Sequence, residues 1–164
     1  MTVKTYRPRT ILQVPSEEIA FTDGDAILDS TQDLNTVQPV YAVATSSGRL
    51  AAHGSQSLIF KNFGITVDTT VLGIELLLHV DRLARVQDRT IQLVYNGSTV
   101  GSNQADLTAA DRHTYGSPTD LWSTTDIDFS GAEFGVLIDL QPHTQYPSNN
   151  LVYLRTVELK VYTA

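Results

Sequence analysis

The sequence predicts an all-β protein, an antiparallel β-sandwich, and three observations point to this fold class. Several segments alternate apolar and polar residues with a period of two, the pattern of a strand that buries one face. Turn residues separate these segments, and no long stretch follows the helical period. A chain of 164 residues that is 41% apolar is long enough to form one domain around its own core.

The clearest strand pattern lies in the middle of the chain. From Leu72 to Val80 every even position is apolar, whereas the odd positions include Gly73, Glu75 and His79. This alternation predicts one buried face and one mostly solvated face. The same reasoning, taken in chain order, predicts strands at residues 10–14, 40–45, 56–63, 72–80, 89–95, 99–102, 132–140 and 157–161.

Two connections between these strands have recognisable chemistry. Asn96-Gly97 is a residue pair that suits a tight primed turn, so the strand ending at Tyr95 is expected to fold back as a hairpin. Residues 103–112 (NQADLTAADR) have a pattern compatible with either a short helix or an irregular connection.

The N-terminal part of the chain differs from the rest. Residues 1–38 show little periodicity and are expected to form an extended, largely irregular arm, packed on the sandwich domain of residues 39–164 or reaching out from it. Lys4, Arg7 and Arg9 are the only charged residues among the first ten, and an acidic segment follows them. This basic arm either docks onto an acidic partner or a neighbouring subunit, or is a frayed, solvated terminus.

Composition excludes several classes of partner and site. Eleven Lys and Arg face eighteen Asp and Glu, a net charge of −7, which disfavours nucleic acid phosphates and anionic lipids. No apolar run has the length of a membrane span, so neither nucleic acid nor membrane is an expected partner. The chain has no cysteine, which excludes thiol chemistry and fits synthesis in a reducing cytoplasm.

No catalytic or cofactor-binding motif is present in the sequence. The histidines are isolated, and the glycine-rich phosphate-binding patterns and the nucleophile elbow are missing. The pair Asp126 and Asp128 lacks any other mark of a sugar-cleaving site. Asp23-Gly24-Asp25, followed by Asp29 and Asp33, is either a calcium-binding loop or an acidic turn without a metal. We therefore expect no enzyme activity, no cofactor and no assigned metal site.

The stretch HTYGSPTDLW (residues 113–122) resembles an active-site loop but is better interpreted as scaffold. Gly116 to Pro118 have the chemistry of a turn. Asp120 is placed to accept hydrogen bonds from nearby backbone N–H groups, and Trp122 is expected to anchor the loop in the core. His113 has no evident partner in the sequence.

Four stretches of the chain resemble jelly-roll-like β-sandwich domains of tailed-bacteriophage virion proteins. They are SQSLIFKNFGITVDTTVLGIELLL, DRTIQLVYNGSTVGSNQA, TYGSPTDLWSTTDIDFSGAEFGVLIDL and VELKVYTA. Together they cover residues 55 to 163 in the order of the family pattern. Ser123 and Glu133 replace a glycine and an asparagine of that pattern, and Thr163 replaces its final tyrosine; these differences concern turns and an edge.

The resemblance implies a jelly-roll-like fold and a structural role in a virus particle, in a capsid decoration (cement) protein, a head fibre or a tail module. It implies no shared catalytic residues. The pattern residues that it marks as structural are Tyr115, Gly116, Asp120, Trp122, Phe134 and Gly135.

We therefore expect a capsid decoration protein that binds and stabilises the head, in a virion assembled in the host bacterial cytoplasm. The expected partners are the major capsid protein or other virion subunits, together with further copies of the chain, a trimer being the first expectation. The alternative is a carbohydrate- or receptor-binding module of a phage tail or fibre.

Overall fold

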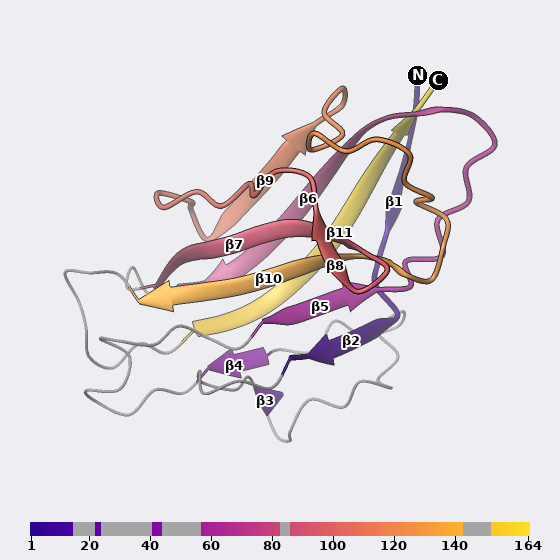
Figure 1. Ribbon diagram of the computed structural model, residues 1–164. Helices are drawn as coiled ribbons and strands as arrows, with labels where there is room; N and C mark the ends of the chain where they lie inside the picture. The colour runs from indigo at the N-terminus through magenta and orange to yellow at the C-terminus, as the bar shows by residue number, and fades with distance from the viewer. Residues whose placement is uncertain (15–21, 24–40, 44–56, 83–85, 143–151) are drawn as a thin grey trace.

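Two antiparallel sheets pack face to face in the computed structural model, which describes residues 1–14, 22–23, 41–43, 57–82, 86–142 and 152–164 (Figure 1). The fold is an all-β sandwich, as predicted, and the described residues contain no helix. The six-stranded sheet has the order β3-β4-β11-β6-β9, with β1 also paired to β11. The five-stranded sheet has the order β2-β5-β10-β7-β8.

The strands of the six-stranded sheet are β1 (Thr2–Tyr6), β3 (Thr22–Asp23), β4 (Tyr41–Val43), β6 (Val71–Asp81), β9 (Arg112–Ser117) and β11 (Val152–Thr163). Those of the five-stranded sheet are β2 (Thr10–Gln13), β5 (Leu58–Lys61), β7 (Val86–Tyr95), β8 (Ser98–Val100) and β10 (Phe134–Pro142). Each strand range predicted from the sequence overlaps one of these strands. The predicted hairpin is also present, because Asn96 and Gly97 both have positive φ between β7 and β8.

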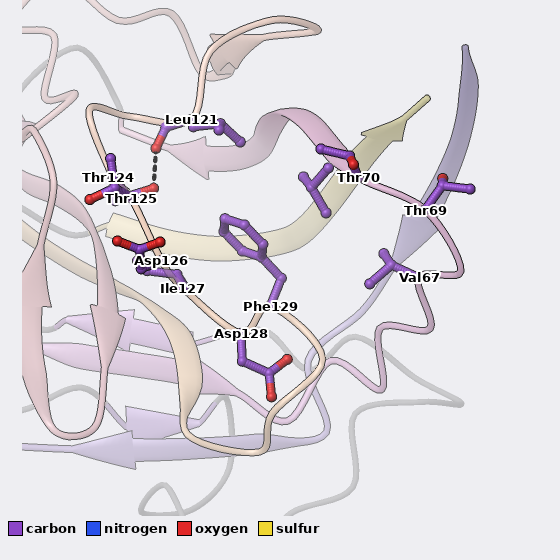
Figure 2. Close-up of a pocket in the computed structure, with 11 residues that line it drawn as sticks. Val67, Thr69, Thr70, Leu121, Thr124, Thr125, Asp126, Ile127, Asp128 and Phe129 are labelled. Carbon is purple, nitrogen blue, oxygen red and sulfur yellow. Dashed lines mark hydrogen bonds between the residues drawn. The ribbon is translucent and has the colours of Figure 1, made fainter.

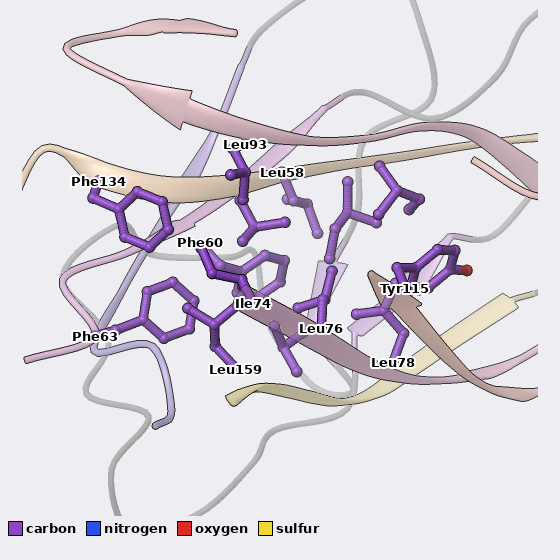
Figure 3. Close-up of a cluster of buried hydrophobic side chains, with 14 of the residues drawn as sticks. Leu58, Phe60, Phe63, Ile74, Leu76, Leu78, Leu93, Tyr115, Phe134 and Leu159 are labelled. Carbon is purple, nitrogen blue, oxygen red and sulfur yellow. The ribbon is translucent and has the colours of Figure 1, made fainter. Parts of the chain in front are cut away.

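The core lies between the sheets and is built from alternate residues of the long central strands (Figure 3). In the β6–β11 ladder, Leu76 pairs with Leu159 and Leu78 with Val157, and all four side chains are buried. The opposite sheet contributes aliphatic residues from β7 and β10 and the aromatic rings of β5 and β10. Alternation along the long central strands thus places most apolar residues on the inner face and most polar residues outside.

Strand β9 was not predicted. Its sequence RHTYGS has one buried residue, Tyr115, because β9 is an edge strand that pairs only with β6. The predicted turn begins later, where the Asp120 backbone N–H donates to the Ser117 carbonyl at 3.1 Å.

No helix forms in the stretch 103–112. Asn103 fixes this segment to β7 instead, because its side-chain oxygen accepts from the Ile91 N–H at 2.9 Å and its amide donates to the Arg89 carbonyl at 3.1 Å. A side-chain amide that replaces a missing strand partner favours an extended connection over a helix.

The N-terminal segment belongs to both sheets. β1 extends along the C-terminal half of β11, in the register Thr2–Thr163 to Tyr6–Leu159, and β2 pairs with β5. The first residues of the predicted arm are therefore regular and packed on the domain, while its residues 15–21 and 24–38 lie outside the described part of the chain. The two ends of the chain lie side by side (Figure 1).

Trp122 joins the six-stranded sheet to the connection that follows it. Its side chain is fully buried, and its indole N–H donates to the Ile74 carbonyl of β6 at 3.1 Å. The indole fits because Gly116 has no side chain: a Cβ there would meet both the indole nitrogen and the Ile74 carbonyl oxygen. Gly116 and Trp122, which come from the Tyr-Gly and Leu-Trp parts of the resemblance, are thus in direct contact.

Replacing Gly116 with alanine should therefore destabilise the fold beyond the cost of its backbone conformation. Gly116 and Gly97 both have positive φ, but a Cβ at Gly97 would meet nothing within 4 Å. We expect Gly97→Ala to lose about 1–2 kcal/mol of unfolding free energy from left-handed strain alone, and Gly116→Ala to lose about 1–3 kcal/mol more from overpacking. Urea unfolding measures both values, and equal losses would contradict the proposed contact.

Candidate interaction surface

The pattern residues of the resemblance hold the scaffold together. Asp120 accepts a hydrogen bond from the Trp122 backbone N–H at 2.6 Å, as expected of a turn aspartate. Phe134 is buried and packs edge-on against Phe129, with ring centroids 5.2 Å apart. A Cβ at Gly135 would meet the Phe60 carbonyl oxygen of the adjacent strand.

Tyr115 belongs to a buried polar network that the sequence did not predict. Its hydroxyl donates to Asp88 Oδ2 at 2.7 Å, and Arg82 Nη1 lies 2.7 Å from Asp88 Oδ1. Asp88 is 0% and Arg82 3% exposed. A buried carboxylate requires such partners, because an unpaired charge in the core is strongly unfavourable.

A β-bulge explains why this network was missed. The register between β10 and β7 shifts between Asp139 and Leu140, so that Leu140 pairs with Asp88 rather than with Arg89. Without the shift, the inward alternation of Ile91 and Leu93 would place Arg89 inside and Asp88 outside. The displaced Arg89 instead forms an ion pair with Asp139, with a distance of 3.0 Å between Nε and Oδ1.

Burial raises the pKa of the Tyr115 hydroxyl, and the negative charge of Asp88 raises it further. The folded protein therefore retains this proton at pH values where a tyrosine in the unfolded chain, with a pKa of about 10, loses it. Because the network is closed to solvent, we interpret it as a structural element of the core rather than a site that meets a substrate.

The unfolding free energy should therefore decrease at alkaline pH, because Tyr115 keeps its proton in the folded protein and loses it in the unfolded chain. Above pH 10, deprotonation of the unfolded chain should lower the unfolding free energy by up to about 1.4 kcal/mol per pH unit. Tyr115→Phe should flatten this slope, measured by urea unfolding between pH 9 and pH 11. Tyr162, near the surface, also has a raised pKa, so Tyr162→Phe serves as a control with a smaller change. An unaltered slope in Tyr115→Phe would contradict the assignment.

The other sequence-predicted polar sites are resolved in part. His113 does have a partner, since its Nε2 lies 3.5 Å from Asp106 Oδ2 and its ring contacts Tyr115. The acidic segment 23–33 lies outside the described residues apart from the backbone of Asp23. Within the described ranges, no three His, Asp or Glu side chains are placed to hold a metal ion. No helix in that part of the chain is long and apolar enough to cross a membrane.

Residues 1–14 form the exposed edge of both sheets on one side of the sandwich, and we call this surface the basic edge. β1 borders the six-stranded sheet and β2 the five-stranded sheet. Among the described residues, most of the exposed large apolar side chains lie here; they are Met1, Val3, Leu12 and Val14, with Leu107 elsewhere. Unpaired strand edges with exposed apolar side chains are common sites of contact with another chain.

The three predicted basic residues of this edge have different environments. Arg7 forms an ion pair with Glu158 of β11, with 2.9 Å between Nη2 and Oε1. Lys4 and Arg9 are exposed, and neither has a carboxylate partner among the described residues. Within the described part of the chain, two of the three charges are therefore left without an ion-pair partner.

An open pocket of about 290 Å³ lies at the end of the sandwich near the chain termini (Figure 2). Apolar side chains, among them Phe129 near its centre, alternate with threonine hydroxyls and two carboxylates, and no lining residue is basic. We call it the acidic pocket; its lining residues are Val67, Thr69, Thr70, Val71, Leu121, Thr124, Thr125, Asp126, Ile127, Asp128 and Phe129. It shares Val67 and Thr69 with a smaller pocket that Lys4 lines.

The two carboxylates of the acidic pocket have different hydrogen-bonding environments. Asp128 accepts hydrogen bonds from the Ser130 hydroxyl and backbone N–H, which lower the pKa of its carboxyl group. Asp126 has no hydrogen-bond or ion-pair partner in the described part of the chain and has a φ of 56°. Trp122 and Ser123 also have positive φ, so the connection is held in a conformation that ordinary residues rarely adopt.

Comparison of the chain with protein-family models and with curated proteins found no match in either case.

Proposed function

We propose that this chain is a non-enzymatic structural protein of a bacteriophage particle, a capsid decoration protein that binds and stabilises the head. The observation that carries the proposal is the resemblance over residues 55 to 163, together with the positions of its pattern residues. Gly116, Trp122 and Gly135 lie where close packing leaves little freedom of residue choice. A jelly-roll-like connection of the strands is part of the same proposal.

The basic edge supports a docking role. It combines exposed apolar side chains with the charges of Lys4 and Arg9, which have no carboxylate partner in the described ranges, on a chain whose net charge is −7. Such a surface favours an acidic partner, and charge complementarity also speeds and orients association. We infer that the major capsid protein or another virion subunit presents that acidic surface.

The double variant Lys4→Gln/Arg9→Gln should bind particles more weakly than the wild type and with a smaller dependence on salt. Quantitative co-sedimentation with particles lacking the protein measures the affinity, and electron microscopy of the reconstituted particles locates the bound copies. The matched control is Arg112→Gln, which removes an exposed charge from β9 on another edge. Binding only at the tail tip would exclude the head assignment, and equal binding by all variants would exclude the basic edge.

The acidic pocket favours a second candidate, a carbohydrate- or receptor-binding module of a tail or fibre. An apolar surface next to hydroxyls and carboxylates suits a sugar, which has an apolar face and many hydrogen-bonding groups. A glycan array with wild type and Asp126→Asn should then show binding that the substitution reduces. An array with no bound glycan would reject this candidate.

A further inference from the structure

The basic edge and the acidic pocket have complementary chemistry. Three of the eleven Lys and Arg, and none of the eighteen Asp and Glu, lie in residues 1–14. Residues 118–133, which form much of the acidic pocket, contain Asp120, Asp126, Asp128 and Glu133 and no basic residue. Each surface also has an apolar component: exposed side chains on the edge and an apolar lining in the pocket.

We propose that the acidic pocket of one copy of the chain receives the start of the basic edge, Met1 to Lys4, from a second copy. In this contact Lys4 approaches Asp126, and an exposed apolar side chain of Met1 or Val3 covers the apolar lining of the pocket. Met1 is 77% and Val3 51% exposed in the single chain, so both gain from burial. The proposal does not depend on the virion function.

Asp126 is the carboxylate best suited to this contact. Asp120 accepts from the Trp122 N–H, Asp128 accepts from Ser130, and Glu133 lies 4.0 Å from Lys61 Nζ. Asp126 alone among the four carboxylates lacks such a partner within the described residues. Within the part of the chain that the structure describes, no group therefore competes with a cation from a second copy for this charge.

Charge also selects the geometry of association. A symmetric pairing of β1 with β1 of a second copy would bring the basic residues of both edges together, which like-charge repulsion disfavours. Contact between the edge of one copy and the pocket of the next avoids this repulsion. Edge and pocket lie at the same end of the sandwich, since the pocket lined by Lys4 shares Val67 and Thr69 with the acidic pocket. Such a head-to-tail contact forms a ring when the rotation between successive copies closes, and an open filament when it does not.

Sedimentation velocity of the full chain over a range of concentrations tests the proposal. We expect association at low salt that weakens as salt is added, because the contact pairs exposed charges. Lys4→Gln and Asp126→Asn should each weaken association by about twofold to fivefold. Asparagine tolerates the positive φ of residue 126, so this substitution removes charge without altering the backbone.

Two controls and one double variant make the test specific. Glu133→Gln, on the same connection, and Arg112→Gln, on β9, should leave association unchanged. Lys4→Glu should weaken association more than Lys4→Gln, because it places two carboxylates together, and adding Asp126→Asn in that background should restore part of it.

A chain that stays monomeric at low salt overturns the proposal. So does equal weakening by Glu133→Gln and Asp126→Asn, or the absence of rescue in the double variant. Particle binding by a strictly monomeric chain would reject this contact and leave the proposed virion function standing.

Discussion

The position of Trp122 is the constraint on which the described structure most depends. The indole is enclosed by the sandwich, and its N–H donates to the Ile74 carbonyl. The backbone carbonyl of Trp122 accepts from the Ser102 N–H at 2.7 Å. One residue thus connects β6, the segment after β8 and the connection that leads to β10. Gly116 and Gly101 are required beside it, because a Cβ at either would meet Trp122 atoms.

The same constraint positions the proposed interaction surface. Residues 124–129 come soon after Trp122 and line the acidic pocket, so the buried indole helps to position Asp126 and Phe129 at the end of the sandwich. The basic edge is positioned independently, by pairing of β1 with β11 and of β2 with β5. A rigid scaffold that carries a basic surface and an acidic surface is suited to assembly, because little conformational entropy is lost when copies or partners bind.

Period-two alternation predicted the central strands because each buries one face, as in Leu72 to Val80. Where a strand or a buried residue owes its position to something other than the burial of an apolar face, the sequence pattern predicted that position less well. β9 is held by pairing with β6, and its polar sequence resembles a turn. Asp88 is inside because a bulge shifts the register by one residue, which local patterns do not reveal. The charge of Lys4 and Arg9 was evident, but the position of Lys4 on β1 and that of Arg9 just before β2 depend on pairing with β11 and β5, far away in the sequence.

The central claim is that this sandwich recognises its partners through the basic edge. Hydrogen–deuterium exchange, compared between the free chain and the chain bound to particles, tests it most directly because it reports each segment separately. The account predicts additional protection in residues 2–13, while exchange in β8 and β9 on the other edges stays the same. Protection confined to β8 and β9, with the exchange of β1 and β2 unchanged, would contradict it.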